Sequence, residues 1–161
     1  MMKTMFLLTA GLLGVSNAAA QEKQAIVPDG METTVESYSY SPAVRAGDMV
    51  YLAGVVAGLP TDPETGEMVE ATPENLDAAF DRAFIHIGEI LAEAGADWDD
   101  VVDMTTYHTD ISAQIDTFLQ VKNRHMKPPH TAWTAIDIDR LYTDTGITEI
   151  KITAYAPLTS E

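Results

Sequence analysis

Hydrophobic residues recur at steps of three and four along the segment between Thr72 and Gly95, which predicts one long amphipathic helix. Thr72 can cap the first free backbone N–H groups, and the proline that follows it fits the first helical turn. Gly95 is a typical residue at a helix end. The side chains expected to face the core are Leu76, Phe80, Ala83, Phe84, Ile87, Leu91 and Ala94.

Apolar or alternating runs predict five strands and a second, shorter helix. The strands are expected over Thr33 to Tyr40, Asp48 to Ala57, Val101 to Thr109, Thr131 to Ile138 and Thr148 to Tyr155, and the helix over Ser112 to Met126. This β-β-α-β-α-β-β order indicates an α+β fold in a single domain, with a mixed β-sheet and two helices on one face. The other face of the sheet would expose apolar side chains, which favours association of subunits.

The N-terminus has the pattern of a secretory signal peptide. Lys3 precedes an uncharged run from Met5 to Val15, and the small residues Ala18 to Ala20 form a cleavage site. These eleven apolar residues are fewer than the roughly 20 that a membrane-spanning helix needs. We expect a periplasmic or secreted protein in which residues 1–20 are the signal peptide, 21–37 an N-terminal extension with the start of the first strand, and 38–158 the folded domain.

The composition restricts which partners the protein can bind and which chemistry it can perform. The chain has 9 Lys and Arg against 25 Asp and Glu, which gives a formal charge of −16. Removal of residues 1–20 takes away one lysine and no acid, which leaves 8 against 25 and a charge of −17. Such a surface repels nucleic acid and anionic membranes. The absence of cysteine excludes disulfides, thiol catalysis and thiolate metal sites. The four histidines have no metal-site spacing, and His86 and His108 are expected to be structural.

Several short motifs follow one another in a specific order. They are Tyr40 with Ser41 to Asp48, the Asp62 to Glu67 loop, Ala94 to Ala96 with Asp100 to Val102, Pro128 to Trp133, and Glu149 with Ile150. In this order and spacing, over about Tyr38 to Pro157, the chain resembles the reactive intermediate deaminase family (RidA, or YjgF-like). Any one of these motifs would be a weak signal, whereas the whole series is specific.

The resemblance implies a chorismate-mutase-like fold and a homotrimer with small-molecule clefts at the subunit interfaces. It also implies a hydrolase that needs no cofactor and deaminates small imines and enamines, such as 2-iminobutanoate, to 2-oxo acids. By position, Tyr40 matches the family tyrosine beside the substrate and Glu149 the glutamate associated with the attacking water, so both are candidate catalytic residues. Gly54 matches the glycine whose backbone lines the cleft.

The segment before the fourth predicted strand departs from the family pattern. His130 stands where the deaminases have the arginine that holds the substrate carboxylate, and Ala132 where some members have cysteine. His130, Thr131 and Trp133 are nevertheless the candidate substrate-binding residues on this segment. Arginine offers a permanently charged fork for a carboxylate, whereas an ordinary histidine, with a pKa near 6.5, is mostly neutral above pH 7.

Because His130 replaces the arginine, three alternatives for the function stay open. One is an exported deaminase, another is a non-catalytic trimeric module that binds a small metabolite, and a third is a holdase-like oligomer. Arg45 or Arg140 could supply a cation in place of the arginine. His130 itself could bind an anion, donate a proton, bind a metal or be a structural histidine.

Overall fold

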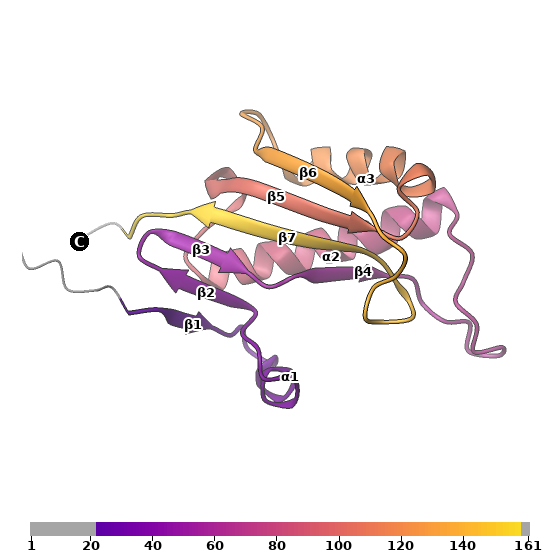
Figure 1. The fold of residues 1–161 in the computed structure, drawn as a ribbon, viewed down its shortest axis with the longest axis horizontal. Coiled ribbons are helices and arrows are strands. Elements are labelled where there is room, and N and C mark those ends of the chain that lie inside the picture. Colours follow the sequence, from indigo (N-terminus) through magenta and orange to yellow (C-terminus); the bar gives the residue numbers. More distant parts are fainter. Residues whose placement is uncertain (1–21, 159–161) are drawn as a thin grey trace, which may run out of the picture.

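The computed structural model describes residues 22–158, which form a seven-stranded sheet with helices packed on it (Figure 1). The strands are β1 (Gln24–Ile26), β2 (Ala43–Ala46), β3 (Met49–Leu52), β4 (Val55–Gly58), β5 (Val101–His108), β6 (Ala132–Asp137) and β7 (Gly146–Tyr155). The helices are α1 (Glu32–Tyr38), α2 (Pro73–Glu93) and α3 (Ile111–His125), with a 3₁₀ turn, η1 (Trp98–Asp100). None of these helices is both long and apolar enough to span a membrane. The predicted signal peptide lies outside the described residues.

β7 is the central strand of the sheet, whose order is β1-β2-β3-β7-β5-β6. β3 and β4 lie end to end along one edge of β7, β3 opposite residues 153–155 and β4 opposite residues 146–150. β5 pairs with the other edge of β7. The pairing of β5 with β6 is parallel and every other pair is antiparallel, because α3 connects β5 to β6 as a crossover. The predicted mixed sheet is confirmed.

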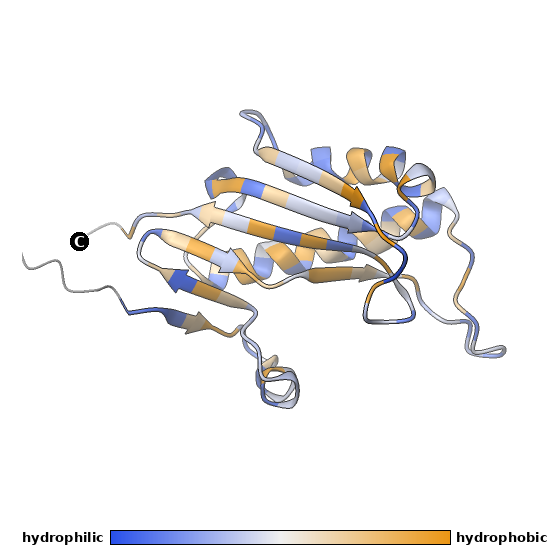
Figure 2. Cartoon of the chain, viewed as in Figure 1, coloured by the Kyte–Doolittle hydropathy of each residue, from blue (hydrophilic) through white to orange (hydrophobic). Residues whose placement is uncertain are grey.

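α2 and α3 lie on the same face of the sheet, as the sequence predicts (Figure 1). Phe80 and Phe84 of α2 and Phe118 of α3 share one buried cluster with Ile150 and Ile152 of β7. Each such side chain stabilises the fold by about 1.5–3 kcal/mol when it leaves water. Hydrophobic and hydrophilic residues alternate along β7 (Figure 2), which is the pattern of a strand with only one face against the core.

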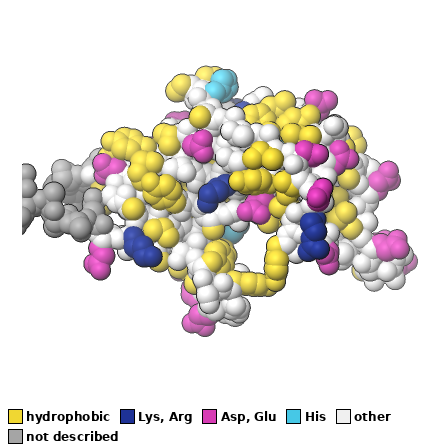
Figure 3. Space-filling view, in the orientation of Figure 1, with side chains coloured by type: hydrophobic (Ala, Val, Ile, Leu, Met, Phe, Trp, Pro, Cys, Tyr) yellow, Lys and Arg dark blue, Asp and Glu magenta, His cyan; other side chains and the backbone are white. Residues whose placement is uncertain are grey.

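The sheet face that α2 and α3 leave uncovered is called the open face below. Figure 3 looks onto it and shows hydrophobic side chains gathered between scattered charges. Tyr51, Val56, Ile136 and Tyr155 are each 37–49% exposed. An apolar surface of this kind on a small domain favours contact with another protein surface.

Three expectations about the N-terminal third are wrong. The strand predicted over Thr33 to Tyr40 is the helix α1, none of whose residues is buried. The strand at the sheet edge beside β2 is instead β1, which comes from the segment expected to be an N-terminal extension. Whether a segment forms a strand depends on a free neighbour in the sheet, and β1 already occupies that edge. The single strand predicted over Asp48 to Ala57 is divided into β3 and β4.

Candidate functional site

The break between β3 and β4 brings two predicted site residues together. Gly54 lies in the break, where a Cβ atom would overlap the carboxylate of Glu149 on the neighbouring β7. Gly54 has no positive φ, so the reason for glycine here is the space that the Glu149 side chain occupies. The Glu149 side chain therefore lies across the backbone of Gly54, half-buried on the open face.

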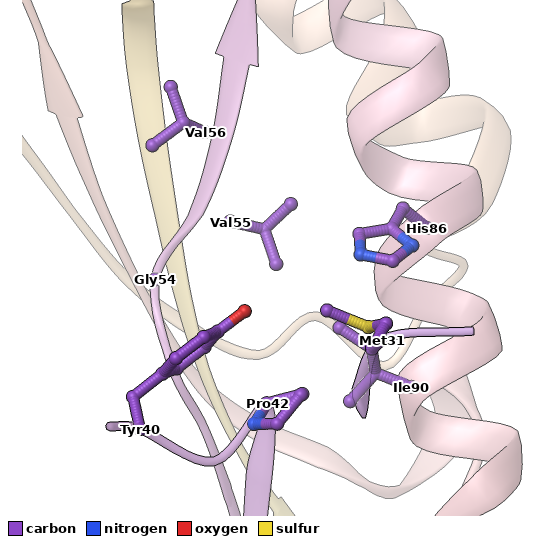
Figure 4. Close-up of a pocket in the computed structure, with 9 residues that line it drawn as sticks. Met31, Tyr40, Pro42, Gly54, Val55, Val56, His86 and Ile90 are labelled. Atoms are coloured by element: carbon purple, nitrogen blue, oxygen red, sulfur yellow. The ribbon is translucent and has the colours of Figure 1, made fainter. Parts of the chain in front are cut away.

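Gly54 also lines a pocket of about 180 Å³, called the Tyr40 pocket (Figure 4). The hydroxyl of Tyr40 points into this pocket toward Val55, and His86 and Met31 lie on the side nearer α2. His86, expected to be structural, is partly exposed, with Nδ1 3.1 Å from Oε2 of Glu89. The pocket thus combines a phenol and an imidazole on otherwise apolar walls.

The other predicted residues line a separate pocket of about 490 Å³, called the His130 pocket, between the end of α3 and the start of β6. Its lining includes His130, Thr131 and Trp133. Lys122 and Lys127 line it as well, and the sequence analysis missed both. The hydroxyl of Thr131 is buried and has no hydrogen-bond partner.

The two pockets are far apart within one chain. Ala132, at the start of β6, lies opposite Asp103 of β5, while Glu149 lies opposite Tyr107 of the same strand. The two positions thus differ by four residues along the strand direction, at about 3.3 Å each, and by two strand spacings of about 4.8 Å. The Cα atoms of Ala132 and Glu149 are therefore roughly 16 Å apart. Within one chain Gly54 lies against Glu149 and also lines the pocket of Tyr40, whereas His130 lines the other pocket.

Trp133 is held firmly in the floor of the His130 pocket. Its indole Nε1 donates a hydrogen bond of 3.0 Å to the hydroxyl of Thr106, and its ring stacks on Phe118 with the centroids 5.7 Å apart. The ammonium nitrogen of Lys122 lies 5.3 Å from the centroid of the Trp133 ring. This geometry is a cation–π contact.

His108 is structural, as expected. It is fully buried, and burial lowers its pKa because the charged ring would lose its hydration. Nδ1 lies 3.0 Å from Gln114 Oε1, an acceptor, so Nδ1 carries the hydrogen. Nε2 then accepts from the hydroxyl of Thr106 at 2.9 Å, and that hydroxyl accepts from Trp133. The neutral ring is fully hydrogen-bonded.

Neither arginine considered as a substitute cation lies in the His130 pocket. Arg45 is only 5% exposed, and its guanidinium donates to the carbonyls of Ala94 at 2.6 Å and Ala156 at 2.7 Å. Arg140 lines a third pocket together with Asp139 and Asp144. The expectation that either could replace the arginine has no support in the fold of the single chain.

His125, five positions before His130, is engaged elsewhere. Its Nε2 lies 2.8 Å from Oδ1 of Asp81, and its ring stacks on Phe84. The pKa of Asp81 lies below its usual value, first because of this hydrogen bond and also because of Arg124. Within residues 22–158 no group of three or more His, Asp or Glu side chains could hold a metal ion.

The fold and the pockets define a class of protein, a small α+β domain with cavities at three places on its surface. A sequence model of the family described as Endoribonuclease L-PSP, which includes RidA and YjgF, matches residues 31–156, and this chain belongs to that family. Both the predicted family and the predicted fold are thereby confirmed. Homotrimers are typical of the family.

Individual relatives agree with this assignment. RutC family protein YjgH of Escherichia coli K12 is 32% identical over 139 residues, which cover 84% of this chain and 97% of that protein. Reactive Intermediate Deaminase A, chloroplastic, of Arabidopsis thaliana is 29% identical over 102 residues, 63% of this chain and 51% of that protein. The solved structure of protein YJGH has a TM-score of 0.66 at 29% identity and covers 86% of this chain and 99% of its own. That of RidA from an Antarctic Psychrobacter has a TM-score of 0.61 at 29% identity, with coverages of 82% and 98%.

Proposed function

We propose that this protein is an exported, cofactor-free hydrolase of small imines and enamines, with its site formed between the subunits of a homotrimer. The observation that carries the proposal is the carboxylate of Glu149, which lies across the backbone of Gly54, a residue that lines the Tyr40 pocket. A carboxylate beside a bound substrate can position and deprotonate a water molecule. The relative named a deaminase supports the same reaction class.

The proposed reaction needs only water and proton transfers. Water adds to the C=N carbon while its proton passes to Glu149, and the π electrons move to nitrogen, which takes up a proton. The resulting carbinolamine releases ammonia as the C=O bond forms: Glu149 gives its proton to the leaving nitrogen, and the hydroxyl proton passes to solvent, which replaces the proton taken up by nitrogen during addition. The hydroxyl of Tyr40, directed into the pocket, is the proposed donor to the charge that develops during addition.

The distance between the two pockets is the reason for proposing a site between subunits. In a closed ring each subunit uses two different surface patches, so two half-sites that are distant in one chain can meet across every interface. We propose that His130, Thr131 and Trp133 of one subunit face Tyr40, Gly54 and Glu149 of the next. The apolar side chains of the open face supply the contact surface for such an assembly.

Ammonia release from 2-iminobutanoate, generated in the assay, tests the activity. Glu149→Gln should lower the rate by a factor of about 10²–10⁴, the usual contribution of general acid–base catalysis. Sedimentation of both proteins should show the same trimer, which controls for assembly. A wild-type rate equal to the uncatalysed rate would exclude the proposed activity, and a monomer would exclude the site between subunits.

A second candidate function is a trimeric module that binds a small metabolite without turning it over. The histidine at position 130 favours it, because the arginine that a deaminase of this family would use is absent. Saturable binding of 2-oxobutanoate with no ammonia release, and unchanged binding in Glu149→Gln, would identify this function.

Export is tested separately by mass spectrometry of the secreted protein, where we expect an N-terminus at Gln21.

A further inference from the structure

Lys122 is a buried cation without an anionic partner. The residue is 8% exposed, in the last turn of α3, and the four ion pairs among residues 22–158 do not include it. Charged groups in protein interiors are normally paired or bound to an ion, because burial removes their hydration. The cation–π contact with Trp133 compensates only part of that loss.

The pocket around Lys122 has the opposite charge to the rest of the molecule. The chain carries −16 overall, yet the residues that line the His130 pocket include two lysines and one histidine and no Asp or Glu. The ammonium of Lys127 is already engaged, since it donates to the carbonyl of Asn123 at 2.8 Å. Lys127 is exposed to water, whereas Lys122 is buried, so Lys122 is the lysine of this pocket whose charge is not compensated by solvent.

A second unused polar group lines the same pocket. The buried hydroxyl of Thr131 has no hydrogen-bond partner, although buried polar groups nearly always have one. An ammonium and a hydroxyl can both donate hydrogen bonds, and a carboxylate can accept from both through its two oxygens. The bond from Trp133 to Thr106 fixes the ring against which the ammonium rests, so the Lys122 side of this arrangement is preorganised.

We propose that Lys122, assisted by the hydroxyl of Thr131, binds the carboxylate group of the ligand in the His130 pocket. Lys122 then takes over, from α3, the task that the family resemblance assigns to an arginine at position 130. The inference deepens the proposed function and rests on it for the nature of the ligand, a small 2-oxo or 2-imino acid. The histidine at position 130 becomes a neighbour of the ligand and not its main cation.

Calorimetric affinity for 2-oxobutanoate tests the role of Lys122. Lys122→Met, which keeps most of the side-chain volume, should weaken binding about ten- to 150-fold, the effect of losing one charge-assisted hydrogen bond. Lys23→Met is the control, because Lys23 is an exposed lysine that lines none of the three pockets. We expect a change of less than about threefold for it, as for other exposed charges.

Two measurements on the unaltered protein do not depend on how the variants fold. The neutral amide of 2-oxobutanoate should bind at least about tenfold more weakly than the acid, because it offers no charge to the ammonium. Affinity for the acid should be nearly constant from pH 6 to 8, since an ordinary lysine stays charged over this range and an ordinary histidine does not. Affinity that rises steeply toward pH 6 and is lost in His130→Ala would overturn the proposal and make His130 the binding cation.

The remaining outcomes separate this inference from the proposed activity. Wild-type affinity in Lys122→Met, or no binding of 2-oxobutanoate by the unaltered protein, overturns the inference even if imines are hydrolysed. Binding that depends on Lys122, with no ammonia release, supports the inference and overturns the proposed activity.

Discussion

Arg45 and Lys122 are both buried cations near the C-terminal end of a helix, but their surroundings differ. The guanidinium of Arg45 donates to Ala94, the C-cap of α2, and to the carbonyls of Ala156 and Gly47. Lys122 lies in the last turn of α3 and rests on a ring, and its hydrogen-bonding capacity is not used in this way. The two residues are 5% and 8% exposed, so burial alone does not distinguish them.

The difference indicates what each cation does. Carbonyl acceptors at a helix end satisfy the donors of Arg45 and place its charge beside the negative end of the helix dipole, which makes it part of the fold. A charge that is buried without such acceptors stabilises the fold little or not at all. Its presence beside a cavity is better explained by a ligand than by folding.

The largest effect is expected at Arg45. Arg45→Met leaves three carbonyls without their donor and should lower the free energy of unfolding by about 3 kcal/mol, measured by urea denaturation. Arg82→Met is the matched control, since Arg82 also donates to a carbonyl, that of Gly58, but at the exposed surface. The control should lose less than about 1 kcal/mol. Equal losses in the two variants would show that the buried contacts of Arg45 have no special role.

An intermediate effect is expected at His108, a buried basic side chain that is neutral. Its pKa is lowered in the folded state, so below about pH 6.5 the unfolded chain binds more protons than the folded one. The free energy of unfolding should therefore fall as the pH drops below 6.5, by up to about 1.4 kcal/mol per pH unit from this group. His108→Gln should reduce the slope between pH 5 and 6.5. An unchanged slope in His108→Gln would contradict the burial argument.

The smallest effect on stability is expected at Lys122. Lys122→Met should change the free energy of unfolding by less than about 1 kcal/mol, with a small gain possible because a methionine pays no desolvation cost. Urea denaturation without ligand, at pH 7, provides the measurement, and Lys127→Met serves as the reference. A loss near 3 kcal/mol would place Lys122 with Arg45 as a structural cation and remove the contrast between them.

The elements that local signals determine were predictable, and those that depend on neighbours were not. α2 begins at Thr72 and Pro73 and keeps one period throughout, so its bounds followed from the sequence. The helix α1 could not be predicted, because β1 occupies the edge where a strand would have paired. Pairing of two strands end to end along β7 also depends on tertiary structure.

The candidate site shows the same division. Tyr40, Gly54 and Glu149 were found through the resemblance, and the structure adds the steric reason why Gly54 and Glu149 belong together. Lys122 was missed because in the sequence it is an ordinary polar residue in the last turn of a helix. Only the crossover from α3 to β6 brings its ammonium onto Trp133, and no local pattern encodes that contact.

The overlap of a Cβ atom at position 54 with the carboxylate at position 149 has a consequence for sequence change. A side chain added at position 54 would displace the Glu149 carboxylate from its place across the backbone of residue 54. The two positions are therefore epistatic. A change at position 54 alone gives a variant whose carboxylate is displaced, so the role that we propose for Glu149 would be lost even though Glu149 itself is unchanged.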